Sequence, residues 1–90
     1  MAEKLNIDQI RADFPVLHQQ VSKAPLIYFD NAATTQKPKS VMDALQHYYE
    51  QDNANIHRGL HTLAERATTA YELTRTKLAT FLNAPSTDQI

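Results

Sequence analysis

Residues 28–38 of this chain read Tyr28-Phe29-Asp30-Asn31-Ala32-Ala33-Thr34-Thr35-Gln36-Lys37-Pro38. A short apolar run, residues 26–29, ends here in an acid, an amide, two alanines and two threonines. Alanine leaves room for close approach to the backbone, and Asn and Thr side chains can hydrogen-bond a ligand or their own backbone. This order of residues predicts a strand that ends at a binding site and presents small and polar side chains there. The same order of residues also occurs at an ordinary turn between a strand and a helix, where no ligand binds.

The composition limits the classes of protein to which the chain can belong. Its 90 residues allow at most one small domain. A net charge of −1 and the lack of a basic stripe argue against a nucleic-acid partner. The sequence has no run of about 18 apolar residues that would predict a membrane span. Its N-terminus lacks the hydrophobic core of a signal peptide. We therefore expect a cytoplasmic protein with no nucleic-acid or membrane partner.

Glycine and cysteine are the two unusual counts. The chain has no cysteine, which excludes disulfides, thiolate metal sites and a cysteine nucleophile within these residues. Gly59 is the single glycine, whereas average usage predicts about six in this length. Walker and dinucleotide loops need several glycines and are also excluded. A chain so poor in glycine is expected to be mainly helical.

Capping patterns and apolar spacing predict where the helices lie. Asn6 with Gln9, and Thr62 with Glu65, are the patterns of two capping boxes, and Pro38 suits the first turn of a helix. Together with the 3.6-residue spacing of apolar side chains, they predict a mainly α chain. The expected elements are helices over about 7–14, 38–51 and 62–83 and one short strand over about 26–29. Residues 53–61 are expected to form a polar loop.

Two features of these elements bear on what the chain does. The strand at 26–29 needs a hydrogen-bonding partner, and the sequence offers none of comparable quality. The helix at 62–83 carries Ala64, Ala67 and Ala70 on a narrow face where another element could pack closely. The unpartnered strand suggests an incomplete unit. The alanine-rich face by itself does not distinguish such an incomplete unit from an autonomous helical interaction module.

The loop before the long helix is a second candidate site. His57, Arg58 and His61 precede a helix N-terminus, where an Arg could bind a carboxylate or a phosphate. A polar loop whose Arg pairs with a nearby acid is the structural alternative. His57 and His61 stand four residues apart, which would suit a metal on a helix, but no third ligand accompanies them and Gly59 argues against a helix there. We therefore expect no metal site.

Three motifs, in order and at matching spacing, resemble the start of SufS-type cysteine desulfurases. They are residues 10–17 (Ile-Arg-Ala-Asp-Phe-Pro-Val-Leu), residues 28–38, and residues 55–63 (Asn-Ile-His-Arg-Gly-Leu-His-Thr-Leu). These enzymes belong to the class V aminotransferase family, which is pyridoxal-phosphate-dependent and has the α/β fold type I. The resemblance covers the chain from about residue 7 to its end. It implies the N-terminal fragment of an enzyme that converts L-cysteine to L-alanine and transfers the sulfur to an enzyme persulfide for iron–sulfur cluster assembly.

The resemblance also implies roles for particular residues. Asn31, Ala32 and Ala33 would line the substrate pocket, and His57 and Arg58 would lie near that pocket or at the dimer contact. It places no catalytic, cofactor-binding or metal-ligating residue in this chain, because the family's Schiff-base lysine and nucleophilic cysteine follow the matched region. The lysines present here are expected to be solvated, and the fragment alone is expected to be inactive.

The resemblance further implies an organisation. Residues 1–90 would form a single incomplete unit, with residues 1–30 an N-terminal arm and small-domain strand. Residues 31–90 would lead into the large domain and end before its first sheet strand. The implied partners are the remainder of the enzyme, a second subunit in a homodimer, and a sulfur-acceptor protein. An autonomous helical interaction module is the alternative function.

Overall fold

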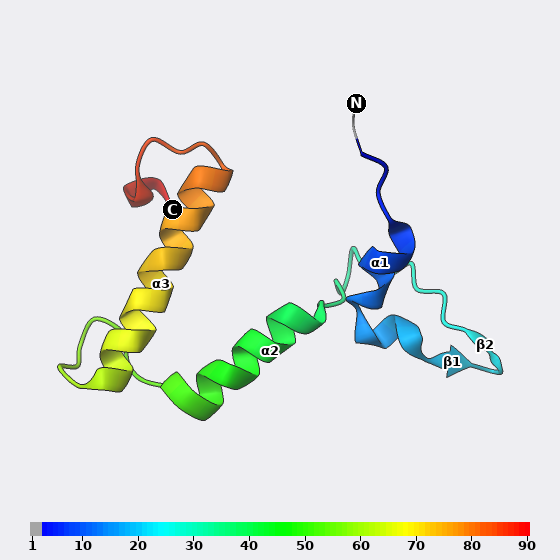
Figure 1. The fold of residues 1–90 in the computed structure, drawn as a ribbon, viewed down its shortest axis with the longest axis horizontal. Helices are drawn as coiled ribbons and strands as arrows, with labels where there is room; N and C mark the ends of the chain where they lie inside the picture. The colour runs from blue at the N-terminus through cyan, green and yellow to red at the C-terminus, as the bar shows by residue number, and fades with distance from the viewer. Residues whose placement is uncertain (1–2) are drawn as a thin grey trace. The chain divides into compact units, whose positions relative to one another are not determined.

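The structure is a computed structural model that describes residues 3–90. The chain divides into two compact units, Met1–Leu45 and Gln46–Ile90. Its regular structure is mainly helical, with one small two-stranded sheet (Figure 1). The predicted mainly α chain with three helices is therefore confirmed, although their bounds differ by a few residues from those expected.

The first unit is built from short elements. They are α1 (Ile7–Ala12), the 3₁₀ helix η1 (Pro15–His18), β1 (Gln20–Val21), β2 (Ala24–Pro25) and the start of α2 (Lys39–His47). The Asn6 side chain accepts a hydrogen bond from the Gln9 N–H at 3.1 Å, which confirms the predicted cap of α1. The carbonyl of Asp13 accepts a bond from the Lys39 N–H at 2.7 Å. This bond joins the end of α1 to the start of α2.

The strand predicted at residues 26–29 is wrong, because the sheet lies immediately before it. β1 pairs antiparallel with β2, and their two-residue turn has positive φ at Ser22 (52°) and Lys23 (66°). Two positive φ values give the twist that a tight hairpin needs. One more bond, from the Leu26 N–H to the Gln19 carbonyl, extends the ladder before the chain leaves it. Residues 27–29, the segment that follows, form neither helix nor strand and have no strand beside them within residues 3–90.

The second unit is dominated by α3 (Thr62–Phe81), with the π-helical η2 (Tyr48–Asp52) before it and the 3₁₀ helix η3 (Thr87–Gln89) after it. The helix begins where expected, but the predicted cap at Thr62 is wrong. His61 is the capping residue, and its Nδ1 accepts a hydrogen bond from the Ala64 N–H at 3.2 Å. Thr62 therefore occupies the first helical position, and an imidazole does the work usually done by a hydroxyl.

The end of α3 is set by Asn83, the last residue of the range 62–83 expected for this helix. Asn83 adopts a left-handed conformation with φ 56°. Its N–H donates to the Thr80 carbonyl at 3.2 Å, and the Ala84 N–H donates to the Ala79 carbonyl at 2.8 Å. This pair of bonds is a Schellman motif, which satisfies carbonyls that the helix leaves without partners.

Within the described residues, the buried hydrophobic side chains are small. They are Ala64, Ala67 and Ala79, which are 1%, 3% and 7% exposed. A Cβ built on Gly59 would lie 2.6 Å from the Cβ of Ala64 and 2.9 Å from the His61 ring. The loop therefore runs directly over the first turn of α3, and the glycine is needed for close approach rather than for a positive φ.

Gly59→Ala is expected to destabilise this loop by about 1–3 kcal/mol, the usual cost of overpacking. The measurement, made in a full-length protein that contains these residues, is hydrogen exchange of backbone amides in residues 57–67, which should become faster. The double variant Gly59→Ala/Ala64→Gly again leaves a single methyl group at the contact, as in the wild type, and should recover part of the protection. Exchange in Gly59→Ala at the wild-type rate would contradict the close contact.

Candidate functional site

The first predicted site lies on a tight turn that follows residues 27–29. The carbonyl of Asp30 accepts hydrogen bonds from the N–H groups of Ala33 (3.2 Å) and Thr34 (3.0 Å). The hydroxyl of Tyr28 lies 2.6 Å from the Thr34 carbonyl oxygen and 3.2 Å from that of Asp30. Residues 31–33 therefore lie in the sequence between two carbonyl groups, those of Asp30 and Thr34, that the Tyr28 hydroxyl contacts. The sequence predicts a site here but gives Tyr28 no role.

Asn31 adds a second set of bonds to this turn. Its carbonyl accepts a bond from the Thr35 hydroxyl at 3.0 Å, and its side-chain oxygen accepts a long one from the Gln36 N–H at 3.4 Å. Ala32 and Ala33 are exposed. Within residues 3–90, the N–H groups of Asn31 and Ala32 donate no hydrogen bond. The turn therefore presents two backbone donors beside small side chains, a combination that suits a small polar ligand.

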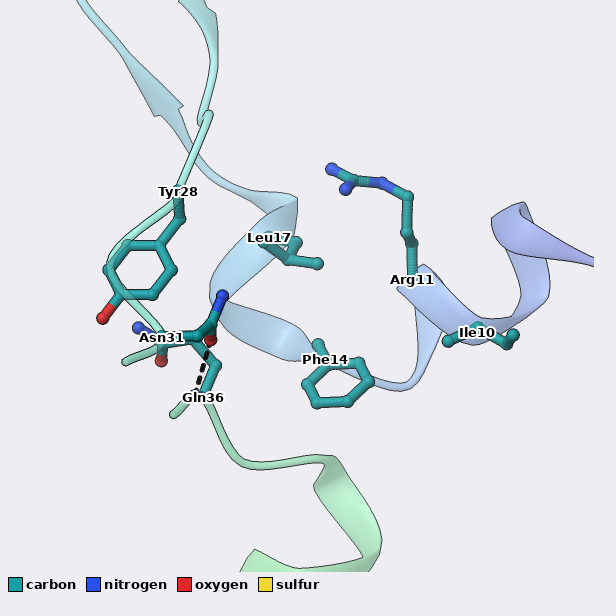
Figure 2. Close-up of a pocket in the computed structure, with 7 residues that line it drawn as sticks. All are labelled: Ile10, Arg11, Phe14, Leu17, Tyr28, Asn31 and Gln36. Carbon is teal, nitrogen blue, oxygen red and sulfur yellow. Dashed lines mark hydrogen bonds between the residues drawn. The ribbon is translucent and has the colours of Figure 1, made fainter. Parts of the chain in front are cut away.

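A pocket of about 230 Å³ lies beside this turn (Figure 2). Four of the side chains that line it are apolar or aromatic: Ile10, Phe14, Leu17 and Tyr28. Three are polar: Arg11, Asn31 and Gln36. Asn31 thus contributes to the pocket, whereas Ala32 and Ala33 do not line it. The sequence motif of residues 10–17 and that of residues 28–38 meet here.

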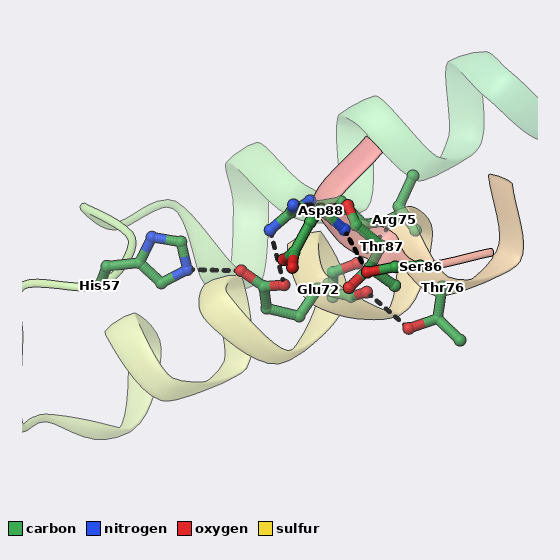
Figure 3. Close-up of polar contacts among 9 residues, drawn as sticks. His57, Glu72, Arg75, Thr76, Ser86, Thr87 and Asp88 are labelled. Carbon is green, nitrogen blue, oxygen red and sulfur yellow. Dashed lines mark hydrogen bonds and ion pairs between the residues drawn. The ribbon is translucent and has the colours of Figure 1, made fainter. Parts of the chain in front are cut away.

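The second predicted site, at His57 and Arg58, lies in the other unit. His57 has a positive φ of 60°, and its N–H donates to the Thr68 hydroxyl at 2.9 Å. Its Nε2 lies 2.8 Å from Glu72 Oε1, so the imidazole donates to a carboxylate that can only accept (Figure 3). The ring also makes an edge-to-face contact with Tyr71, with 5.7 Å between centroids. His57 is therefore anchored on α3.

The same carboxylate connects His57 to the end of the second unit. Glu72 Oε2 accepts a bond from Arg75 Nη1 at 3.3 Å, and Arg75 Nη2 donates to the Thr87 carbonyl at 2.7 Å (Figure 3). Glu72 and Arg75 stand three residues apart on α3, whereas the contact of Glu72 with His57 spans fifteen residues and could not be predicted from spacing. All these side chains are at least partly exposed, so each ion pair contributes little to stability.

Arg58 differs from its neighbour. Its side chain is exposed, and it makes no hydrogen bond or ion pair within residues 3–90. The structural alternative, in which this Arg pairs with a nearby acid, does not hold for the described residues. His61 is used as the helix cap. The part of the chain that the structure describes contains no group of three or more metal-ligating side chains that could hold an ion.

The alanine-rich face of α3 is partly used within the chain itself. Ala64 and Ala67 are buried, and Gly59 approaches Ala64 closely, whereas Ala70 is exposed. The face proposed for docking in an autonomous module is thus already covered at its N-terminal end. None of the helices in residues 3–90 combines the length and the hydropathy that crossing a bilayer requires.

Comparisons with known proteins agree with the motifs. The family model described as aminotransferase class-V matches residues 27–90. A protein of Synechocystis sp. described as a probable cysteine desulfurase is 57% identical over 81 residues, which cover 90% of this chain and 19% of that protein. A cysteine desulfurase of Synechococcus elongatus is 54% identical over 85 residues, covering 94% of this chain and 14% of its own length.

The fold has a counterpart among solved structures. The apo structure of a cysteine desulfurase from Thermococcus onnurineus NA1 matches with a TM-score of 0.76 and 39% identity, over 93% of this chain and 20% of that one. The chain thus spans about a fifth or less of the length of these relatives. The family model covers well over half of the chain, so this protein belongs to the class V aminotransferase family.

Proposed function

We propose that this chain forms one wall of the substrate pocket in a pyridoxal-phosphate-dependent cysteine desulfurase. The turn at Asn31–Ala33 carries the proposal, because it combines an amide side chain, two alanines and two backbone N–H groups that donate no hydrogen bond within residues 3–90. A small amino acid needs close approach to backbone donors and little steric competition. The relatives described above are cysteine desulfurases, which supports L-cysteine as the substrate.

The proposed reaction divides its parts between this chain and the rest of the enzyme. The carbon–sulfur bond of L-cysteine breaks, the sulfur passes to an enzyme thiol as a persulfide, and L-alanine leaves. The chain has no cysteine, so that thiol must come from another part of the enzyme. A sulfur-acceptor protein for iron–sulfur cluster assembly would then remove the persulfide sulfur, in the cytoplasm.

The lysines of this chain do not fit the cofactor. A Schiff-base lysine is usually desolvated or placed beside another cation, which lowers its pKa. The lysines within residues 3–90 are all exposed: Lys4, Lys23, Lys37, Lys39 and Lys77. Lys37 donates to the Thr35 carbonyl at 2.7 Å, and Lys39 pairs with Asp43 at 2.6 Å. We therefore assign pyridoxal phosphate to residues outside this chain.

His57 and Arg58 are proposed to contribute to an anionic pocket or to the contact with a second subunit. The bonds from His57 to Thr68 and Glu72 hold the loop on α3. Arg58 follows on this anchored loop with an exposed guanidinium, which could pair bidentately with a carboxylate. A homodimer would supply the second subunit. In this arrangement His57 positions the loop and Arg58 makes the contact.

The test is L-cysteine turnover by a full-length enzyme carrying these residues, with the isolated chain as the comparison. The full-length enzyme with pyridoxal phosphate should form alanine, and in the presence of a thiol reductant should release one sulfide for each alanine. The isolated chain with the same cofactor should form neither. Sulfide release by the isolated chain would overturn the division of roles, and a full-length enzyme that forms no alanine from L-cysteine would overturn the proposed reaction.

A further inference from the structure

We propose that Tyr28 is a positioning residue for the turn at residues 31–33, the substrate turn, an inference that rests on the proposed function. Its hydroxyl is 2.6 Å from the Thr34 carbonyl oxygen and 3.2 Å from the Asp30 carbonyl oxygen. These two carbonyls flank Asn31, Ala32 and Ala33. One side chain therefore spans the ends of the segment that we assign to L-cysteine.

The hydroxyl has a single hydrogen, and the geometry indicates where it goes. The Thr34 carbonyl is the nearer acceptor, whereas the Asp30 carbonyl already accepts bonds from the N–H groups of Ala33 and Thr34. Backbone bonds thus hold the start of the turn at Asp30, and the Tyr28 hydroxyl holds its end at the Thr34 carbonyl. Ala32 and Ala33 have no side-chain groups that could hold their own position. Their placement depends on the backbone, and the Tyr28 hydroxyl ties that backbone down.

The ring of Tyr28 also forms part of a pocket wall. It is partly buried and lines the pocket together with Phe14 and Leu17, while Asn31 and Gln36 line the same pocket (Figure 2). A Tyr ring has few rotatable bonds, so a packed ring places its hydroxyl accurately. The ring therefore lines one pocket together with side chains of α1 and η1, on which the turn also borders. This gives the motif of residues 10–17 a purpose that the proposed function leaves unassigned.

The test is Tyr28→Phe in the full-length enzyme, because this change removes the hydroxyl and keeps the ring. Loss of one neutral hydrogen bond predicts an increase of about fivefold in the KM for L-cysteine, with a smaller change in kcat. Backbone amides of residues 31–36 should exchange their hydrogens faster. A structural role alone would lower the amount of active enzyme and leave KM unchanged.

Tyr49→Phe is the matched control, since Tyr49 is 67% exposed and its hydroxyl makes no hydrogen bond within residues 3–90. It should leave KM and exchange at wild-type values. The proposal is overturned if Tyr28→Phe keeps the wild-type KM, or if KM rises without faster exchange in residues 31–36. A wild-type enzyme that turns over no L-cysteine would instead overturn the proposed function, so the two failures are distinguishable.

Discussion

The isolated ninety-residue chain is expected to lose helical signal gradually on heating, without a cooperative transition. Its buried hydrophobic residues within 3–90 are three alanines, whereas Phe29, Leu60 and Phe81 are 94%, 100% and 84% exposed. A folded domain is stable by about 5–15 kcal/mol only because a core offsets the loss of chain entropy. Three alanines cannot supply that core, so the net stability should be near zero.

Far-ultraviolet circular dichroism against temperature tests this expectation, with size-exclusion chromatography and light scattering to detect self-association. The exposed apolar side chains of α2 and α3, such as Val41, Leu45 and Leu63, should favour association at higher concentration. The full-length enzyme is the control and should unfold in a steep transition. A monomeric isolated chain with a sigmoidal melting curve and dispersed amide chemical shifts would contradict the prediction.

Ala33→Leu in the full-length enzyme is expected to lower kcat/KM for L-cysteine by about 10- to 100-fold, the equivalent of about 1–3 kcal/mol of steric cost. Ala33 is exposed in this chain, and its N–H donates to the Asp30 carbonyl at 3.2 Å. A larger side chain can keep this bond. Its extra volume would then fall where we place the substrate rather than in the core of the fold.

Steady-state kinetics with L-cysteine provide the measurement. Ala44→Leu on α2 is the matched control, because Ala44 is also exposed and lies outside the substrate turn. It should leave kcat/KM within about twofold of the wild type. Equal losses in the two variants would point to a general effect on folding, and unchanged kinetics in Ala33→Leu would remove Ala33 from the substrate pocket.

Local signals in the sequence predicted the helices well. The Asn6 cap, the apolar spacing and Asn83 place α1 and α3 to within about two residues, because such signals act between residues a few positions apart. The hairpin was missed for the same reason. Ser22 and Lys23 adopt the two positive φ values without the glycine or asparagine that usually announces them. The apolar run that follows therefore carries the stronger sequence signal for a strand, although it forms none.

The candidate site likewise combines features that local sequence signals predict with features that they do not. Residue types and short spacings were enough to indicate the family, the helical character and the small polar segment at residues 31–33. The tertiary structure decided that Tyr28 closes this turn, that His57 is anchored to Glu72 fifteen residues away, and that Gly59 permits contact with Ala64. Such contacts depend on where the backbone brings distant side chains, and no pattern of neighbouring residues encodes that placement.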